Sequence, residues 1–355
     1  MKALNAHEKR LAGLARSVRA AIVVPSLFAL ALLVFRQPAM AGFAVFGTFA
    51  HLVMIDYDTA GTARAGQCAA LSLLGAITIA LGTLTSASVW VAVAGTLVAG
   101  FLIELLPLLN GRMAAIRTPL LLSFMLAVAA PAPAGLVSSN VAGWLLAGIA
   151  AQPALLLIWV SLQATSAAEQ GGAAGESIAD RPVAASGHEW IANAASSGMA
   201  MAVAVLLARI LEVNHAFWIV LGAAPLLSAN VRSAAQKFWQ QQLGTSVGFL
   251  LGVIVVTAAG PHQTWYWTIL PFIVFGSAFA ASAVGFMAGQ AAFTVFVVVL
   301  FCILMPQQTE VGILRVADIA IGGLACLLLA ALRQLVSMGL WTVAGERATV
   351  QGSAN

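Results

Sequence analysis

The stretch Ala216–Val255, AFWIVLGAAPLLSANVRSAAQKFWQQQLGTSVGFLLGVIV, decides the fold of this chain. It holds two apolar runs, Phe217–Leu227 and Leu243–Val256, with basic and amide side chains between them. A helix that spans a membrane needs about 20 mostly apolar residues, and charged side chains between such runs belong at the membrane surface. The stretch therefore predicts two membrane helices joined by a turn at the surface.

The first of these runs is shorter than a full span and contains Gly222 and Pro225. Proline removes a backbone donor and kinks or breaks a helix, and glycine weakens it. Within a membrane, a carbonyl that loses its partner must bond to a neighbouring group or to cavity water, so a broken span often lines a transport path. A kink that only packs against protein is the alternative, and both interpretations stay open.

An earlier stretch, Phe43–Leu81, has the same layout of a short apolar run, a turn with Arg64 and a longer apolar run. The separation along the chain from Gly47 to Gly222, called the repeat offset below, also pairs residues in other predicted helices. These further pairs are Phe43 with Trp218, Gln67 with Gln242, Pro131 with Pro306 and Asn140 with Arg315. Because one offset serves several separate helices, the sequence predicts a duplicated unit.

The composition is that of a membrane protein. Hydrophobic residues make up 61% of the chain, charged residues 8%, and the mean hydropathy is +0.99. A soluble domain has about 25% charged residues, so we predict an all-α integral membrane protein. The net charge of +4 does not indicate nucleic-acid binding, because the basic residues stand singly between apolar spans. Cys68, Cys302 and Cys326 lie in apolar runs without metal-ligand spacing, which favours small core residues.

Hydropathy divides the chain into two predicted six-helix repeats and three polar segments. Residues 1–19 are expected to form an amphipathic cytoplasmic lead-in, 20–161 the first transmembrane repeat, 162–194 a cytoplasmic linker, 195–336 the second repeat and 337–355 a cytoplasmic tail. With both termini cytoplasmic, 13 of the 16 Lys and Arg residues fall on the inner side, as the positive-inside rule requires. An even number of spans per repeat makes the repeats parallel, related by a pseudo-twofold axis along the membrane normal.

Three stretches of the second half resemble the fusaric acid resistance protein-like family of bacterial inner-membrane proteins. They are HAFWIVLGA (His215–Ala223), RSAAQKFWQQQLGTSVGFLLG (Arg232–Gly252) with its Gly-Thr pair, and EVGILRVADIAIGG (Glu310–Gly323). The resemblance covers about residues 195 to 336. It implies export of aromatic carboxylic acids across the bacterial inner membrane, and plant malate channels are among the family's relatives. The chain departs from the family in having Gln240 and Gln241 where an Arg usually precedes the Gly-Thr pair.

Ionisable side chains inside apolar spans are functional candidates by default, because burying them in a membrane is costly. Arg315 and Asp318 are three residues apart on one helix face, where Arg315 can attract a carboxylate and Asp318 can exchange a proton. A pair that only locks two helices together is the alternative. Arg209, near the outer end of its span, is a second candidate for binding an anion, although reaching to the membrane interface also explains it.

Two further proton-coupling candidates lie in the first half. Glu104 follows an apolar run with no charged neighbour in sequence, so it either pairs with a base on another helix or carries a proton. His51 lies near the inner end of the second span, where it can shuttle protons or serve as a hydrogen-bonded core residue.

Aromatic side chains at the starts of the two broken spans are candidates for stacking on an aromatic ligand. Trp218, Phe43 and Phe46 occupy these positions, and packing within the protein is the alternative role. With Gly222 and Pro225, they complete the predicted substrate path.

No catalytic set, nucleotide loop, cofactor motif or metal-ligand cluster is evident in the sequence, so we expect a protein that is not an enzyme. The leading hypothesis is a proton-coupled exporter of small organic, aromatic carboxylate anions. Two alternatives stay open: a passive anion channel, and a membrane scaffold that binds an envelope-assembly partner. The expected partners are the lipid bilayer, the organic anion, and a second copy of the chain or an envelope protein.

Overall fold

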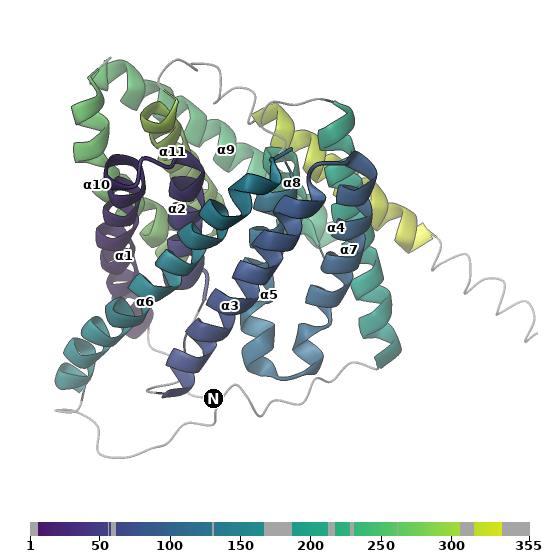
Figure 1. Cartoon of the computed structure of the whole chain (residues 1–355), viewed down its shortest axis with the longest axis horizontal. Helices are drawn as coiled ribbons and strands as arrows, with labels where there is room; N and C mark the ends of the chain where they lie inside the picture. The colour runs from purple at the N-terminus through teal and green to yellow at the C-terminus, as the bar shows by residue number, and fades with distance from the viewer. Residues whose placement is uncertain are drawn as a thin grey trace, which may run out of the picture.

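The computed structural model describes residues 6–55, 57, 62–129, 131–166, 187–211, 217–227, 231–260, 262–305 and 316–335. Within these residues every regular element is helical, as Figure 1 shows. The candidate residue Arg315 lies outside them, as do most of the predicted linker and the tail.

The helices follow the hydropathy of the sequence. The first group is α1 (Ala6–Ala29, continued by a π-helical turn, Leu30–Val34), α2 (Pro38–Leu52), α3 (Thr62–Thr85), α4 (Val89–Glu104), α5 (Gly111–Val128) and α6 (Val137–Ser166). The second group is α7 (Gly187–Ile210), α8 (Phe217–Ala223), α9 (Val231–Ala259), α10 (Gln263–Ala283), α11 (Phe286–Leu304) and a last helix, Val316–Leu335. The predicted lead-in is continuous with the first span, because α1 runs unbroken from Ala6.

Ten of the described helices are long and apolar enough to cross a membrane. The two shorter apolar helices are Pro38–Leu52 and Phe217–Leu226, which are the two runs that the sequence marks as short or broken. Large apolar side chains cover the outside of the bundle, with Trp90 and Phe272 each 74% exposed. A surface of this kind suits lipid rather than water, so the chain is an all-helical, multi-pass membrane protein.

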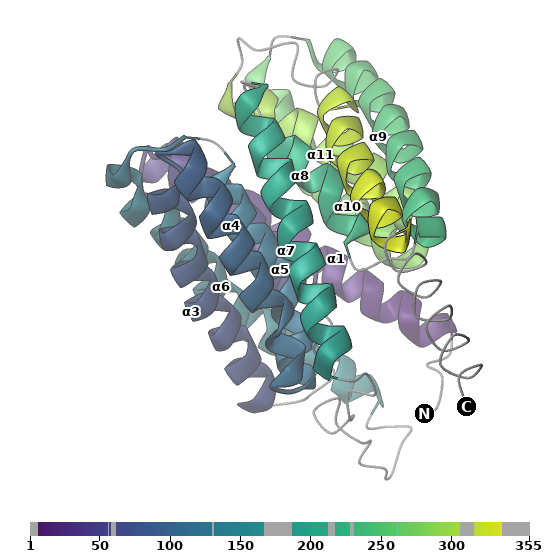
Figure 2. The ribbon, with the colours of Figure 1, turned by 90° about the vertical axis from the view of Figure 1, so that its right-hand side faces the viewer.

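Helices from the two groups pack against each other across the bundle. Helix α1 lies along α10, and α7 lies along α4 (Figures 1 and 2). Within the groups, α2 packs on α6, α3 on α5, and α9 on α11. Each group therefore contributes its first helix to the other group's packing.

Glycines set the closest helix contacts. A β-carbon added at Gly222 in α8 would lie 2.9 Å from Ile319 Cα in the last helix. One added at Gly244 in α9 would lie 2.5 Å from the Met287 carbonyl oxygen in α11. Small residues let membrane helices approach closely, and packing is then the main force that holds them together.

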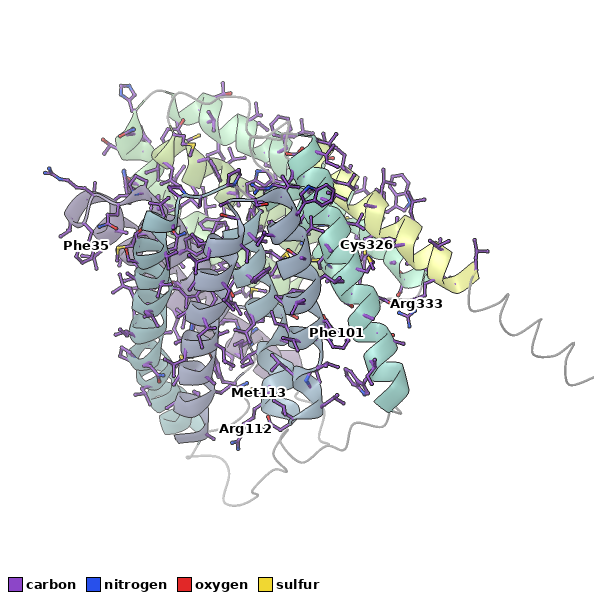
Figure 3. The ribbon with its side chains drawn as sticks, turned by 45° about the vertical axis from the view of Figure 1, so that its right-hand side comes forward. Phe35, Phe101, Arg112, Met113, Cys326 and Arg333 are labelled. Carbon is purple, nitrogen blue, oxygen red and sulfur yellow. The ribbon has the colours of Figure 1, made fainter. Side chains whose placement is uncertain are left out.

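Labelled residues at the two ends of the bundle are consistent with helices that run alternately up and down. Figure 3 shows Phe35, which follows α1, at one end of the molecule, and Arg112 and Met113, at the start of α5, at the opposite end. The Arg333 side chain of the last helix donates to Asn193 Oδ1 near the start of α7, at 2.6 Å. The start of α7 and the end of the last helix are thus tied together.

Candidate functional site

A cavity of about 470 Å³ lies between the two groups of helices. This volume falls within the range of small-molecule sites, about 300–1,000 Å³. Its lining comes from α2, α5, α6, α8 with the 3₁₀ turn that follows it, α9, α10, α11 and the last helix. The lining residues are Phe46, Phe49, Ala50, Met54, Thr118, Pro119, Leu122, Ser123, Leu126, Trp144, Phe217, Leu221, Ala224, Pro225, Gln241, Ser277, Ala281, Phe286, Gly289, Gln290, Phe293 and Ile319.

Aromatic rings form much of the wall. The ring of Phe46 lies 5.5 Å from that of Phe217 and 6.4 Å from that of Phe293, centroid to centroid. Phe49 also contacts Phe293, at 5.4 Å, and Trp144 closes another side. Such offset and edge-on arrangements leave ring faces and edges available to an aromatic ligand. From Thr118 to Leu126 the cavity follows about 12 Å of α5, so it has the length of a substituted aromatic ring.

The break in α8 explains how one polar group comes to line the cavity. In a regular helix the N–H of residue 225 would bond to the carbonyl of Leu221, but Pro225 has no N–H. Gln241 in α9 replaces that donor, and its Nε2 donates to the Leu221 carbonyl at 3.1 Å. The helix continues as a 3₁₀ turn, Ala224–Leu226. The freed carbonyl is thus satisfied by a neighbouring helix, as the membrane setting demands.

This bond leaves the other amide atom of Gln241 without a partner. Gln241 is 1% exposed, and its Oε1 is buried with no hydrogen-bond partner among the described residues. The same holds for the hydroxyl of Ser277, on α10, which also lines the cavity. Buried polar atoms are normally hydrogen-bonded, and exceptions call for an explanation such as an absent water or ligand. In the part of the chain that the structure describes, no Asp, Glu, Lys, Arg or His lines the cavity.

The structure places only some of the predicted substrate residues at the cavity. Pro225 lines the cavity, and Gly222 packs against the lining residue Ile319. Phe43 and Trp218 are buried and do not line the cavity. The Trp218 ring lies 5.1 Å from that of the lining residue Phe217 and 5.8 Å from that of Phe301. Arg209 donates to the Ser86 carbonyl between α3 and α4 and does not line the cavity.

The predicted proton-coupling residues lie around the cavity but not in its wall. Asp318 is 4% exposed and directly precedes the lining residue Ile319, and its Oδ2 has no partner among the described residues. Glu104 is paired with Arg117 of α5, with Oε2 and Nη1 2.8 Å apart.

His51 lies behind Trp144, with ring centroids 5.1 Å apart. Its Nδ1 is 2.7 Å from the Gly47 carbonyl and its Nε2 is 3.0 Å from Ser72 Oγ. Both ring nitrogens therefore have partners, as expected for a hydrogen-bonded core histidine.

Sequence reasoning missed Phe49, Phe293, Trp144, Gln241 and Ser277 as lining residues. Gln241 stood out only as a departure from the family pattern. The signal that could have found it is the spacing from Pro225 to an amide on the next helix, because a proline inside a membrane helix requires a donor from elsewhere. The aromatic residues resemble the many other apolar residues of the chain, and hydropathy alone does not separate them.

The fold and the cavity define a class: an all-helical, multi-pass membrane protein with a mainly apolar cavity between two groups of helices. Among the described residues, no group of three His, Cys, Asp or Glu side chains is placed to hold a metal ion.

Residues 202–329 match the family described as fusaric acid resistance protein-like, which confirms the resemblance predicted from the sequence. The match indicates a membrane transport or resistance protein. No curated protein and no solved structure gives a significant match to the chain.

Proposed function

We propose that this protein is an inner-membrane exporter of small organic, mainly aromatic, carboxylates, driven by the proton gradient. The observation that carries the proposal is the 470 Å³ cavity, whose wall combines aromatic rings from both groups of helices with the two short helices. A ligand held between two groups of helices can be exposed to one side of the membrane and then the other by rocking of those groups.

The proposal includes two parallel six-helix repeats, and the packing supports them. Gly47 packs against Trp144, and Gly222 packs against Ile319. The repeat offset that relates Gly47 to Gly222 also relates Trp144 to Ile319, so the two contacts correspond. Other lining residues obey the same offset, namely Phe46 with Leu221, Phe49 with Ala224, Ala50 with Pro225 and Thr118 with Phe293.

The crossed helix pairs support the same arrangement. Under the repeat offset, α1 corresponds to α7 and α4 corresponds to α10. The contact of α1 with α10 then has its counterpart in the contact of α7 with α4. The first helix of each repeat, α1 or α7, packs against a helix of the other repeat. These contacts join the two repeats and leave the cavity between them.

Asp318 is the strongest candidate for coupling. Its carboxyl is buried beside the cavity, whereas Glu104 already has Arg117 as a partner. Within the proposal, Arg315 and Arg209 attract the anion before it enters the cavity, Asp318 exchanges the proton, and Glu104 and His51 support the helices around the cavity. Both termini are cytoplasmic, as the distribution of Lys and Arg predicts.

The test is uptake of radiolabelled benzoate into proteoliposomes under an imposed pH gradient. We expect accumulation above equilibrium by the unmodified protein, and at least a tenfold lower uphill rate for Asp318→Asn because the variant cannot exchange a proton. Counterflow at equal pH should persist in that variant.

Two outcomes would replace the proposal. Steady anion currents across a planar bilayer without any gradient would identify a channel. No flux of benzoate, together with a stable complex with a copurified envelope protein, would favour the scaffold. Glu104→Gln is the matched control and should retain uphill transport, because its carboxyl is held in an ion pair.

A further inference from the structure

We infer that the cavity binds its ligand as an uncharged acid, with the carboxyl group protonated, and rejects the carboxylate. The inference rests on the proposed function for the ligand class and adds which protonation state the site accepts. It follows from the charges around the cavity and from the two buried atoms that lack partners.

Among the described residues, the wall contains no cationic side chain that would compensate a carboxylate. Two described cations lie close to lining residues without lining the cavity themselves. Arg117, next to Thr118, is paired with Glu104, and Lys237 is an exposed side chain whose Nζ donates to the Pro225 carbonyl at 3.3 Å. An ionised carboxylate moved into apolar surroundings without a counter-charge loses its hydration and gains little in return.

The other titratable groups near the wall do not favour an anion. Asp318 of the last helix is buried directly before the lining residue Ile319, and as a carboxylate it would repel an anion nearby. His51 faces it from α2 behind Trp144, with both ring nitrogens already bonded. The described lining residues of α6, α8, α10 and α11 include no titratable side chain.

The hydrogen-bonding pattern points the same way. Gln241 Nε2 is committed to the Leu221 carbonyl, which fixes the amide orientation and leaves Oε1 as an acceptor. The Ser277 hydroxyl remains able to donate. A carboxylate is only an acceptor and cannot satisfy Gln241 Oε1. A protonated carboxyl or a primary amide offers a donor of the kind that Gln241 Oε1 lacks and an acceptor for the Ser277 hydroxyl.

Three probes of similar size separate the protonation states: benzoic acid, benzamide, which is always neutral, and benzenesulfonate, which is always an anion. Binding to the purified protein in detergent is followed by tryptophan fluorescence across a range of pH. We expect benzamide to bind at every pH within about threefold of benzoic acid at acidic pH. Above the pKa of benzoic acid, its apparent Kd should rise about tenfold per pH unit, because only the neutral fraction binds.

The result that overturns the inference is clear. If benzenesulfonate competes as well as benzoic acid, or if the Kd of benzoic acid is constant above its pKa, the cavity accepts anions. The transport proposal would survive that outcome. If none of the three probes binds and benzoate is not transported, the proposed function fails as well, so the two failures are distinguishable.

Two variants locate the site. Ser277→Ala removes a hydroxyl without touching the Gln241–Leu221 bond, and it should weaken benzamide binding about tenfold with an unchanged melting temperature. Gln241→Glu removes the amide donor and adds a titratable acid, so at high pH it should exclude benzoic acid further while a folded protein remains. An unchanged benzamide Kd in both variants would place the ligand elsewhere and refute the inference.

Discussion

Two helix pairs that are related by the repeat offset both have close glycine contacts, at Gly82 of α3 in the first pair and at glycines of α9 in the second, but they differ in their polar contacts. In the first, α3 and α5 are joined by a hydrogen bond between the hydroxyls of Thr78 and Ser123, with the oxygens 2.7 Å apart. In the second, α9 and α11 bring backbone close to backbone at Gly244 and Gly248, and Gly252 lies against the Val298 side chain. The residues at the positions of Thr78 and Ser123 are both valines, Val253 and Val298.

The comparison extends to the helix that closes each group. Trp144 in α6 fills the space left by Gly47 and Gly75, and its Nε1 donates to the Leu71 carbonyl at 3.3 Å. The corresponding residue of the last helix, Ile319, meets Gly222 through its backbone instead. The same helix arrangement is therefore packed in two ways: by a large aromatic ring that fills the space beside two glycines, or by a close contact between a glycine and the backbone of the neighbouring helix. Each group contributes a polar side chain to the cavity lining, Ser123 from α5 and Gln241 from α9.

The largest expected effect is at Trp144, because this buried ring packs against both α2 and α3. Trp144→Ala should lower the free energy of unfolding by about 3–5 kcal/mol, the usual cost of emptying a buried aromatic site. Unfolding in mixed micelles with increasing SDS measures it. Trp90→Ala is the matched control, since Trp90 is 74% exposed on the outside, and should change stability by less than about 0.5 kcal/mol. Equal effects at both positions would show that the ring does not hold the group together.

The second-largest effect is expected at the glycine contact between α9 and α11. A β-carbon at Gly248 would overlap the Ala291 carbonyl oxygen, whereas one at Gly276 would meet nothing within 4 Å. Gly248→Ala should therefore cost about 1–3 kcal/mol through overpacking. Gly276→Ala should be neutral or slightly stabilising, because alanine favours a helix more than glycine does. If both variants unfold at the same SDS fraction, backbone proximity does not hold α9 to α11.

The sequence was sufficient for the class of fold, and the reason is physical. Apolar runs of membrane length have few alternatives to helices, because every backbone group must bond within the segment. The two runs that are too short, with Gly222 and Pro225 in one of them, appear in the structure as the two short helices. The match of residues 202–329 likewise confirms the family resemblance.

The site was less predictable, because side-chain direction within an apolar helix leaves little trace in composition. Phe43 and Trp218 were candidates for stacking on a ligand, yet both are buried and do not line the cavity, while Phe46 and Phe49 line it. Phe43, Phe46 and Phe49 follow one another at intervals of three residues, which is less than one turn of a helix. Only the contacts between helices decide which face is turned inward, and those contacts join residues far apart in sequence.

The smallest expected effect belongs to the hydroxyl pair of the first group. Thr78→Val and Ser123→Ala, singly and together, form a double-mutant cycle that isolates their interaction. Hydrogen bonds between membrane helices contribute about 0.6 kcal/mol on average, since the unfolded helices also find partners. Each hydroxyl additionally lies within bonding distance of a carbonyl of its own helix, Gly75 or Leu120, which keeps the coupling small. A coupling of about 0.6 kcal/mol in SDS unfolding would mean that the ring and the glycine contacts, rather than this bond, set the stability of the two groups. A coupling above about 1.7 kcal/mol, the upper end of such values, would reverse the comparison and make the polar contact the stronger one.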